Sequence, residues 1–330
     1  MKHWKLFAFV IFVAKQSSVE PKRNRNLLYQ RPNGAYASEF FEVEDVANWQ
    51  WHEEDYLVSN WRRKCSSIQS GNSSFKIRSF IAGGMLADMD KFPFLVGLLL
   101  IAQPRIFQCG GSLISKNYVL TAGHCLLRST AGRVFVGSYV YANVASSEFV
   151  YNVTNSDFII NERYNGLNGF LDDIALIHLK QPVTLSPRVQ IIALAPSFMT
   201  EKYLKSEIVT AAGWGRTADN SSEFNTKLFY VATPVLTFDK CMCFYLPGLV
   251  NRRKHLCADG TGGRGGCDGD SGGPLVYTHR GKDYLVGVTS FGSAGGCEIG
   301  HPTVYTRITN YLHWIYKKTG METYRARGLN

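Results

Sequence analysis

From Ile81 onward, short apolar runs alternate with Gly, Pro and Asn, and the windows between them are too short for amphipathic helices. Short runs of β-branched and aromatic residues bounded by turn residues are typical of strands. We therefore predict strands over 94–101, 118–122, 133–139, 173–179, 207–214, 227–235, 273–278, 283–291 and 303–308. Many short strands joined by turns predict an all-β sandwich or a pair of barrels.

The C-terminal end has a different pattern. Thr309 is a candidate N-cap, and the helix after it would carry Tyr311, Leu312 and Ile315 on one side. Two lysines fall near its C-terminus, where cations suit the helix dipole. We expect residues 320–330 to form a polar tail.

The N-terminus carries basic residues, an unbroken apolar run over 6–14, and then polar residues to 18. This order is typical of a secretory signal, and the run is too short to span a bilayer. A short buried helix is the alternative, but the position at the chain terminus favours the signal. We expect residues 1–18 to be a signal peptide and the protein to be secreted. No later run reaches membrane-spanning length, so no membrane partner is expected.

Residues 19–80 are polar and uneven, with an acidic aromatic stretch over 39–55 and a basic, Ser-rich stretch over 60–74. Neither a helical nor a strand period persists there, and so short a segment with one cysteine is too small to bury a core of its own. It is either a flexible leader or a pro-segment that docks on the folded domain, and we favour the pro-segment.

Composition narrows the class of protein. Hydrophobic residues make up 45% of the chain and charged residues 19%, which excludes disordered and collagen-like chains. The net charge of +10 is spread along the chain, and its densest run is only 252–254. Because no basic stripe with interleaved aromatic residues is present, we expect no nucleic-acid partner.

Eight cysteines in an exported chain indicate disulfides, because the export pathway is oxidising. Export also makes the triplets at Asn72, Asn152 and Asn220 candidate glycosylation sites. Cys241 and Cys243 have the spacing of metal ligands, but no second pair with zinc spacing accompanies them. We therefore expect no metal.

The glycine-rich stretch 258–275 fits a dinucleotide-binding pattern only by accident, because cysteines and another strand follow where a helix is needed. Asp268 opens a calcium-loop pattern, yet its twelfth position is His279 rather than Glu. We expect no cofactor.

What remains of this stretch is GDSGGP around Ser271, where glycines let the backbone turn tightly. The turn allows a hydroxyl and neighbouring amides to face one substrate carbonyl. A serine needs a base, which His124 in TAGHC offers, and the base needs a carboxylate, which Asp173 in DIAL offers. Three independent motifs in the order His, Asp, Ser predict nucleophilic catalysis.

With these motifs, the chain resembles the chymotrypsin-like (trypsin-fold) serine endopeptidases over 81 to about 319. The resemblance implies two antiparallel six-stranded Greek-key barrels with a C-terminal helix, an active site between the barrels, and protein or peptide substrates. Protein inhibitors and a monomeric state are expected with it. Further motifs that carry it are IAGG at 81–84, CGGSLI at 109–114, GWG at 213–215 and VYTR at 304–307.

The resemblance also implies the roles of the site residues. Ser271 attacks the scissile carbonyl, His124 takes and returns the proton, and Asp173 fixes the imidazole. The amides of Gly269 and Ser271 form the oxyanion hole. Ser290 matches the serine that touches the catalytic aspartate.

The resemblance also implies a specificity pocket, whose positions are matched to this chain by counting from the two serine motifs. Gly265 occupies the pocket floor, and Gly266 and Gly292 keep the walls open. Without a carboxylate at the floor, a buried Lys or Arg head group would lack a partner. Thr303 should make the base shallower, and Phe291 stands where the family usually has Trp. We expect Leu, Met, Phe or smaller aliphatic residues before the scissile bond.

The IAGG motif implies zymogen activation between Phe80 and Ile81, after which the new amine should pair with Asp270. Phe80 departs from the family, which mostly has Arg or Lys there. The implied activating protease is chymotrypsin-like, or else cleavage after Arg78 is followed by trimming.

The resemblance implies three disulfides within the domain and leaves two cysteines over. Its pairs are Cys109 with Cys125, Cys267 with Cys297, and Cys257 with either Cys241 or Cys243. Cys241 fits the spacing from Pro234 and Cys243 fits the loop length, and we prefer Cys241. Cys65 and Cys243 then remain, and we expect them to bond, the alternative being a free thiol or an intermolecular pair.

Two other functions compete with a serine endopeptidase. One is a non-catalytic, protease-like binding protein that has lost a catalytic residue, and the other is an adhesion or structural protein. All three catalytic positions are occupied here, which favours the enzyme.

Overall fold

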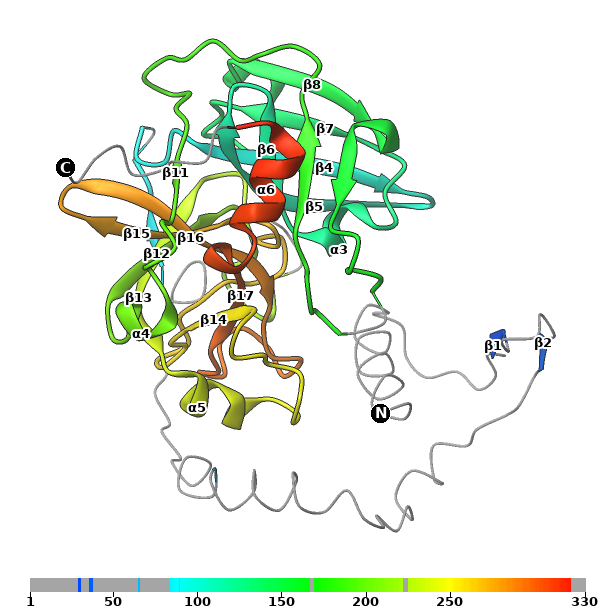
Figure 1. Ribbon diagram of the computed structural model, residues 1–330. Coiled ribbons are helices and arrows are strands. Elements are labelled where there is room, and N and C mark those ends of the chain that lie inside the picture. The colour runs from blue at the N-terminus through cyan, green and yellow to red at the C-terminus, as the bar shows by residue number, and fades with distance from the viewer. Residues whose placement is uncertain are drawn as a thin grey trace.

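The computed structural model describes residues 29–30, 36–37, 65, 84–88, 90–166, 169–221 and 225–321. The predicted signal peptide, the cleavage site before Ile81 and residues 322–330 lie outside them. So does the predicted pro-segment, apart from Cys65 and the short strands β1 (Tyr29–Gln30) and β2 (Tyr36–Ala37). The expected fold class is confirmed, since two antiparallel β units lie side by side and one longer helix follows them (Figure 1).

The first β unit is a curled, seven-stranded antiparallel sheet. Its strands, in spatial order, are β8 (Phe149–Thr154), β7 (Ala131–Val136), β4 (Leu95–Ala102), β5 (Arg105–Ser115), β6 (Tyr118–Thr121), β10 (Ala175–His178) and β9 (Phe158–Ile160). Leu98, Leu100 and Leu120 are fully buried. Burial of such side chains contributes about 1.5–3 kcal/mol each, so the apolar runs hold this sheet curled around its core.

The second β unit is a closed barrel of six strands, because β16 pairs with both β15 and β17. The strands, in spatial order, are β16 (Lys282–Phe291), β15 (Pro274–His279), β12 (Ile208–Gly213), β13 (Phe229–Leu236), β14 (His255–Ala258) and β17 (Thr303–Arg307). Buried and half-buried residues alternate along β13, as the period of a strand with one core face requires. Two short strands extend this unit: β11 (Ala193–Leu194) pairs with β16 in parallel, and β3 (Met85–Leu86) pairs with β13 in antiparallel fashion.

Several strands were not anticipated. The sequence analysis gave no strand for β5, β8, β9 or β14. β5 contains two adjacent glycines, β8 is a half-exposed edge strand, and β9 and β14 are only three and four residues long. Cross-strand pairing rather than local propensity decides these elements.

The other helices described in full are single turns. They are α3 (Gly123–Leu126), α4 (Glu201–Leu204) and α5 (Phe238–Cys241), with 3₁₀ turns at Val144–Ser146, Asn155–Asp157, Met242–Phe244 and Ile308–Asn310. The expectation that Thr309 caps the last helix is wrong, because Thr309 lies inside a 3₁₀ turn and α6 (Leu312–Thr319) begins after Tyr311. The helix ends at Gly320, whose φ of 68° is the left-handed conformation that glycine favours.

Helix α6 packs on the first β unit although it follows the last strand of the second (Figure 1). Tyr311 and Ile315 are buried in the same core cluster as Leu98 and Leu120. The indole of Trp314 donates a hydrogen bond to Glu162, which lies just after β9. The C-terminal segment thus connects the two units, because it leaves the second unit and packs on the core of the first.

Four disulfides are present, and no described cysteine is free. They join Cys109 to Cys125, Cys241 to Cys257, Cys267 to Cys297, and Cys65 to Cys243. The pairs include the preferred partner of Cys257 and the expected bond to Cys65. The last bond links a residue of the predicted pro-segment to the turn after α5.

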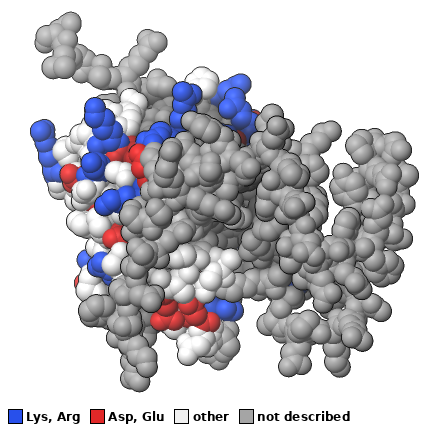
Figure 2. Space-filling view, turned by 90° about the horizontal axis from the view of Figure 1, so that it is seen from below, with Lys and Arg blue, Asp and Glu red and all other residues white. Residues whose placement is uncertain are grey.

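Charged side chains of both signs share the surface. On the described part of the face shown in Figure 2, basic side chains lie beside acidic ones. Among the described helices, none is both long and apolar enough to cross a membrane.

Candidate active site

His124 lies in the single-turn helix α3, directly after the apolar strand β6. Gly123 allows this turn to form, because a Cβ there would lie 2.6 Å from the ring of Tyr164. The disulfide between Cys109 and Cys125 ties the same turn to β5. The imidazole is 19% exposed and is therefore held in place yet accessible from one side.

Asp173 lies just before β10, and its carboxylate is fully buried. One oxygen accepts the backbone N–H of His124 at 2.8 Å. The other accepts the His124 Nδ1–H at 2.8 Å and the Ser290 hydroxyl at 2.6 Å. Because a carboxylate only accepts, the imidazole proton is placed on Nδ1 and Nε2 is left with a free lone pair.

Ser271 lies in the turn that enters β15. Its backbone oxygen accepts the N–H of Gly110 at 2.7 Å, so the turn is docked on β5 of the first unit. This approach requires small residues, since a Cβ on Gly110 would lie 3.0 Å from the Cα of Gly273. Gly269 and Gly272 have φ values of 98° and 78°, which only glycine adopts at low cost.

The turn presents free hydrogen-bond donors. Within the described part of the chain, neither the N–H of Gly269 nor that of Ser271 donates to a protein acceptor. No hydrogen bond joins the Ser271 hydroxyl to the His124 imidazole in this structure. Contacts of this kind are often long without substrate and tighten only in the reacting complex.

The predicted pocket residues lie on three neighbouring segments. The Thr303 hydroxyl on β17 accepts the N–H of Gly266 at 3.1 Å. A Cβ on Gly265, whose φ is 156°, would lie 2.5 Å from that hydroxyl. A Cβ on Gly292 would meet no atom within 4 Å, so the wall at this residue is open. The three residues that meet here, Gly265, Gly266 and Thr303, are all uncharged.

The sequence analysis did not anticipate two residues beside the site, Phe170 and His255. The Phe170 ring meets His124 edge-on, with 6.1 Å between centroids, and stacks on Phe291 at 4.7 Å. His255 is buried, and desolvation lowers its pKa to about 4, so it is neutral. Its Nδ1 accepts the N–H of Asn251 and its Nε2–H donates to the Phe170 oxygen at 3.2 Å. The only signal in the sequence was that Phe170 lies three residues before Asp173.

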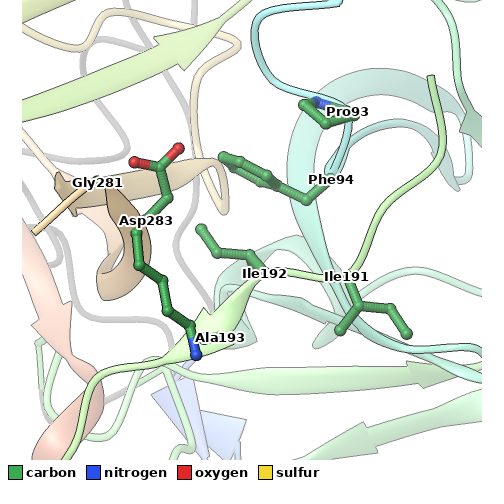
Figure 3. A pocket seen from close by; sticks show the side chains of 8 residues that line it. Pro93, Phe94, Ile191, Ile192, Ala193, Gly281 and Asp283 are labelled. Atoms are coloured by element: carbon green, nitrogen blue, oxygen red, sulfur yellow. The ribbon is translucent and has the colours of Figure 1, made fainter. Parts of the chain in front are cut away.

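A pocket of about 480 Å³ lies elsewhere on the molecule (Figure 3). Phe94, Ile192 and Asp283 line it: the first two lie just before β4 and β11, and Asp283 lies at the start of β16. It includes none of the predicted site residues, and no serine, histidine or cysteine lines it.

Known proteins similar to this chain identify its family. The family model described as Trypsin matches residues 81–315. The chain belongs to the trypsin family. Brachyurin of Leptuca pugilator is 36% identical over 73% of this chain and 99% of its own length. Collagenase of Hypoderma lineatum is 34% identical over 78% of this chain and 94% of its own length.

Two further similarities support the same family. Chymotrypsin-like elastase family member 1 of Canis lupus familiaris is 33% identical over 71% of this chain and 90% of its own length. A solved structure of HL collagenase has a TM-score of 0.65 and 33% identity, and covers 73% of this chain and 99% of its own. The expected family and enzyme class are confirmed, and this trypsin-family protein is a serine endopeptidase.

Asp270, next to the candidate nucleophile, carries a second buried carboxylate. It accepts the N–H of Gly215 at 2.7 Å and that of Cys267 at 2.9 Å. Burial raises the pKa of Asp270 to about 7, because these two bonds offset only part of the desolvation cost. A cation beside the Asp270 carboxylate would stabilise its charged form.

This carboxylate makes the stability of the uncleaved chain depend on pH. Its pKa is higher in the folded chain than in the unfolded chain, so its contribution to stability is present below about pH 4 and is lost as the pH rises through about 7. We expect the free energy of unfolding to fall by on the order of 4 kcal/mol across this window. Asp270→Asn should remove this component, as measured by chemical denaturation at several pH values.

Asp268→Asn is the matched control, because the Asp268 side chain is 74% exposed and its loss should change the pH dependence little. An equally steep pH dependence in wild type and Asp270→Asn would show that Asp270 is not the group responsible.

Proposed function

We propose that the chain hydrolyses peptide bonds through an acyl-enzyme on Ser271, with His124 as general base and acid and Asp173 as the group that orients it. The observation that carries this proposal is the fully buried Asp173 carboxylate, which accepts both N–H groups of His124. A carboxylate in this position selects the imidazole tautomer that can accept the Ser271 proton.

In the first half of the reaction, the Ser271 oxygen attacks the scissile carbonyl while Nε2 of His124 takes the hydroxyl proton. Negative charge develops on the carbonyl oxygen, and the N–H groups of Gly269 and Ser271 are the donors that receive it. One such donor is worth about 2.7–4 kcal/mol of transition-state stabilisation. The imidazolium returns its proton to the leaving amine, which departs.

In the second half, water replaces the amine. His124 takes a proton from the water, the resulting tetrahedral species uses the same two N–H groups, and Ser271 leaves as its hydroxyl. Asp173 stays ionised throughout and stabilises the imidazolium in both halves. The Ser290 hydroxyl keeps the carboxylate aligned by the bond it donates.

Replacing Ser271 or His124 by Ala tests these roles. Each change should lower kcat for a peptide substrate by about five to six orders of magnitude, because the groups act as a unit. A serine-directed phosphonate should label wild type and fail to label Ser271→Ala. Ser112→Ala is the control, since Ser112 is a buried serine whose hydroxyl has no hydrogen-bond partner. Normal turnover by folded Ser271→Ala would refute the mechanism, whereas an activated wild type without turnover would favour a binding protein.

We propose that the enzyme cleaves after uncharged residues and prefers aliphatic ones. The base of the pocket holds Gly265 and the Thr303 hydroxyl, which is already tied to Gly266. A Lys or Arg head group would lose its water there without gaining a carboxylate. The side chain of Thr303 occupies depth that a Phe ring would need, and the relative named elastase agrees with such a pocket.

Shortening Thr303 should deepen the pocket. In Thr303→Gly, the ratio of kcat/KM for Phe over Val before the scissile bond should rise by about tenfold or more. Thr303→Ser is the control, because it keeps the hydroxyl bonded to Gly266 and removes only a methyl group. A peptide library measures both variants, and a dominant preference for Arg or Lys in wild type would overturn the proposal.

We propose that the protein is secreted as a zymogen and activated by cleavage before Ile81, so that the new amine pairs with Asp270. The buried carboxylate of Asp270, which two N–H groups only partly satisfy, supports this role. Cys65 is bonded to Cys243. Cleavage would therefore leave a two-chain enzyme whose leader stays attached beside the turn after α5.

Electrophoresis of activated protein tests the tether. Without reductant we expect one band, and with reductant we expect separate leader and peptidase bands, the latter starting at Ile81 by N-terminal sequencing. The double variant Cys65→Ser, Cys243→Ser should release the leader without reductant. Release of the leader from activated wild type without reductant, or a different N-terminus, would contradict the proposal.

A further inference from the structure

The residue before the candidate catalytic carboxylate, Asp172, has an unusual backbone. Its φ is 62°, in the left-handed region that few residues other than glycine occupy. The N–H of Ile174 donates to the Asp172 oxygen at 2.8 Å, which closes a tight turn around Asp173. The direction in which Asp173 enters the site therefore depends on this left-handed residue.

The Asp172 side chain is also buried, being only 6% exposed. Its Oδ2 lies 2.5 Å from the Lys254 ammonium, and its Oδ1 accepts the Tyr311 hydroxyl at 3.1 Å. Both partners come from outside the first β unit, since Lys254 immediately precedes β14 and Tyr311 immediately precedes α6. The left-handed turn is thus held by two separate segments.

The charges around this turn do not balance without Lys254. Asp172 and Asp173 are adjacent carboxylates, both buried. His255 faces them from β14 but is neutral, because burial lowers its pKa to about 4. Burial also raises the pKa of Tyr311, so its hydroxyl stays protonated and donates without adding charge. Lys254 is therefore the cation that compensates Asp172.

We propose that the ion pair of Lys254 with Asp172 positions the triad. The pair holds the left-handed turn that aims Asp173 at His124, and its lysine neutralises the extra buried charge of Asp172 beside Asp173. Lys254 and Asp172 are positioning residues in this account, since they act through Asp173. The proposal rests on the catalytic roles proposed above for His124 and Asp173. Neither Lys254 nor Asp172 was singled out for a role by any sequence motif.

The pair makes two predictions that an ion pair of purely structural value does not make. Without Lys254, the unpaired Asp172 adds negative charge near His124 and stabilises the imidazolium, so the acidic limb of the kcat profile should move to higher pH. Without the Asp172 charge, the unpaired ammonium should move the limb to lower pH. The two shifts have opposite signs.

The experiment compares Lys254→Met, Asp172→Asn and the double variant in the activated, full two-chain protein. Lys254→Met should lose about ten- to a hundredfold in kcat with KM unchanged, because the triad is misaimed while substrate contacts remain. The acidic limb of its pH profile of kcat should move to higher pH by about half a unit. Asp172→Asn should also lose kcat, because it too breaks the ion pair that holds the turn, but it should lose less than Lys254→Met since Asn tolerates the left-handed backbone, and its acidic limb should fall. The double variant should recover the acidic limb of wild type but not its kcat, because no ion pair is left to hold the turn.

Arg252→Met is the matched control, because it removes one cation from the same turn, and the ion pair of Arg252 with Asp239 is exposed. Lys254→Arg keeps the charge and should retain kcat. If Lys254→Met is too unstable to assay, the lower kcat and lower acidic limb of Asp172→Asn, together with the return of the limb in the double variant, still decide the question.

Wild-type kcat and an unshifted acidic limb in Lys254→Met would overturn the proposal, and so would a double variant with wild-type kcat or with the acidic limb of Lys254→Met. Phosphonate labelling of wild-type Ser271 distinguishes a failure of the proposed catalytic function from a failure of the positioning role. Unlabelled wild type would contradict the proposed function itself, whereas labelled wild type with unchanged Lys254→Met kinetics would contradict only the positioning role.

Discussion

A buried negative charge, the carboxylate of Asp173, is the constraint on which the site depends. An ionised carboxylate removed from water is costly unless both of its oxygens accept hydrogen bonds. Here the backbone N–H and Nδ1–H of His124 and the hydroxyl of Ser290 supply those donors. The same bonds that make the charge tolerable also fix the imidazole, so the stability of the site and its chemistry have one origin.

The donors to Asp173 do not come from one β unit. Asp173 and His124 belong to the first unit, whereas Ser290 on β16 and Thr306 on β17, which donates to the Asp173 backbone oxygen at 2.7 Å, belong to the second. In the opposite direction, the Ser271 turn of the second unit is docked on Gly110 of the first. Each unit thus positions a reactive group of the other, and the relative placement of the two units is set at the site itself.

The sequence could predict the parts whose signal is local. The triad motifs and most long strands rest on residue types within a few positions of one another, and the tight turn at Ser271 needs glycines that the motif displays. The cysteine pairs were expected from the resemblance to the family rather than from a local pattern. The sequence could not predict contacts between distant segments. Phe170, His255 and Lys254 gain their places through partners 82 to 85 residues away, so no local pattern marks them. The expectation that Thr309 caps the last helix is wrong for a related reason. Burial of Tyr311 and Ile315, rather than the local pattern, sets where α6 begins.

The most direct test of this account is the steady-state kcat of Asp173→Asn for a peptide substrate near neutral pH. An asparagine amide facing Nδ1 would favour the imidazole tautomer with its proton on Nε2, which cannot accept the Ser271 proton. The account predicts a loss of about 10⁴-fold in kcat with the fold retained. Turnover by folded Asp173→Asn within about tenfold of wild type would contradict the claim that this buried carboxylate governs the site.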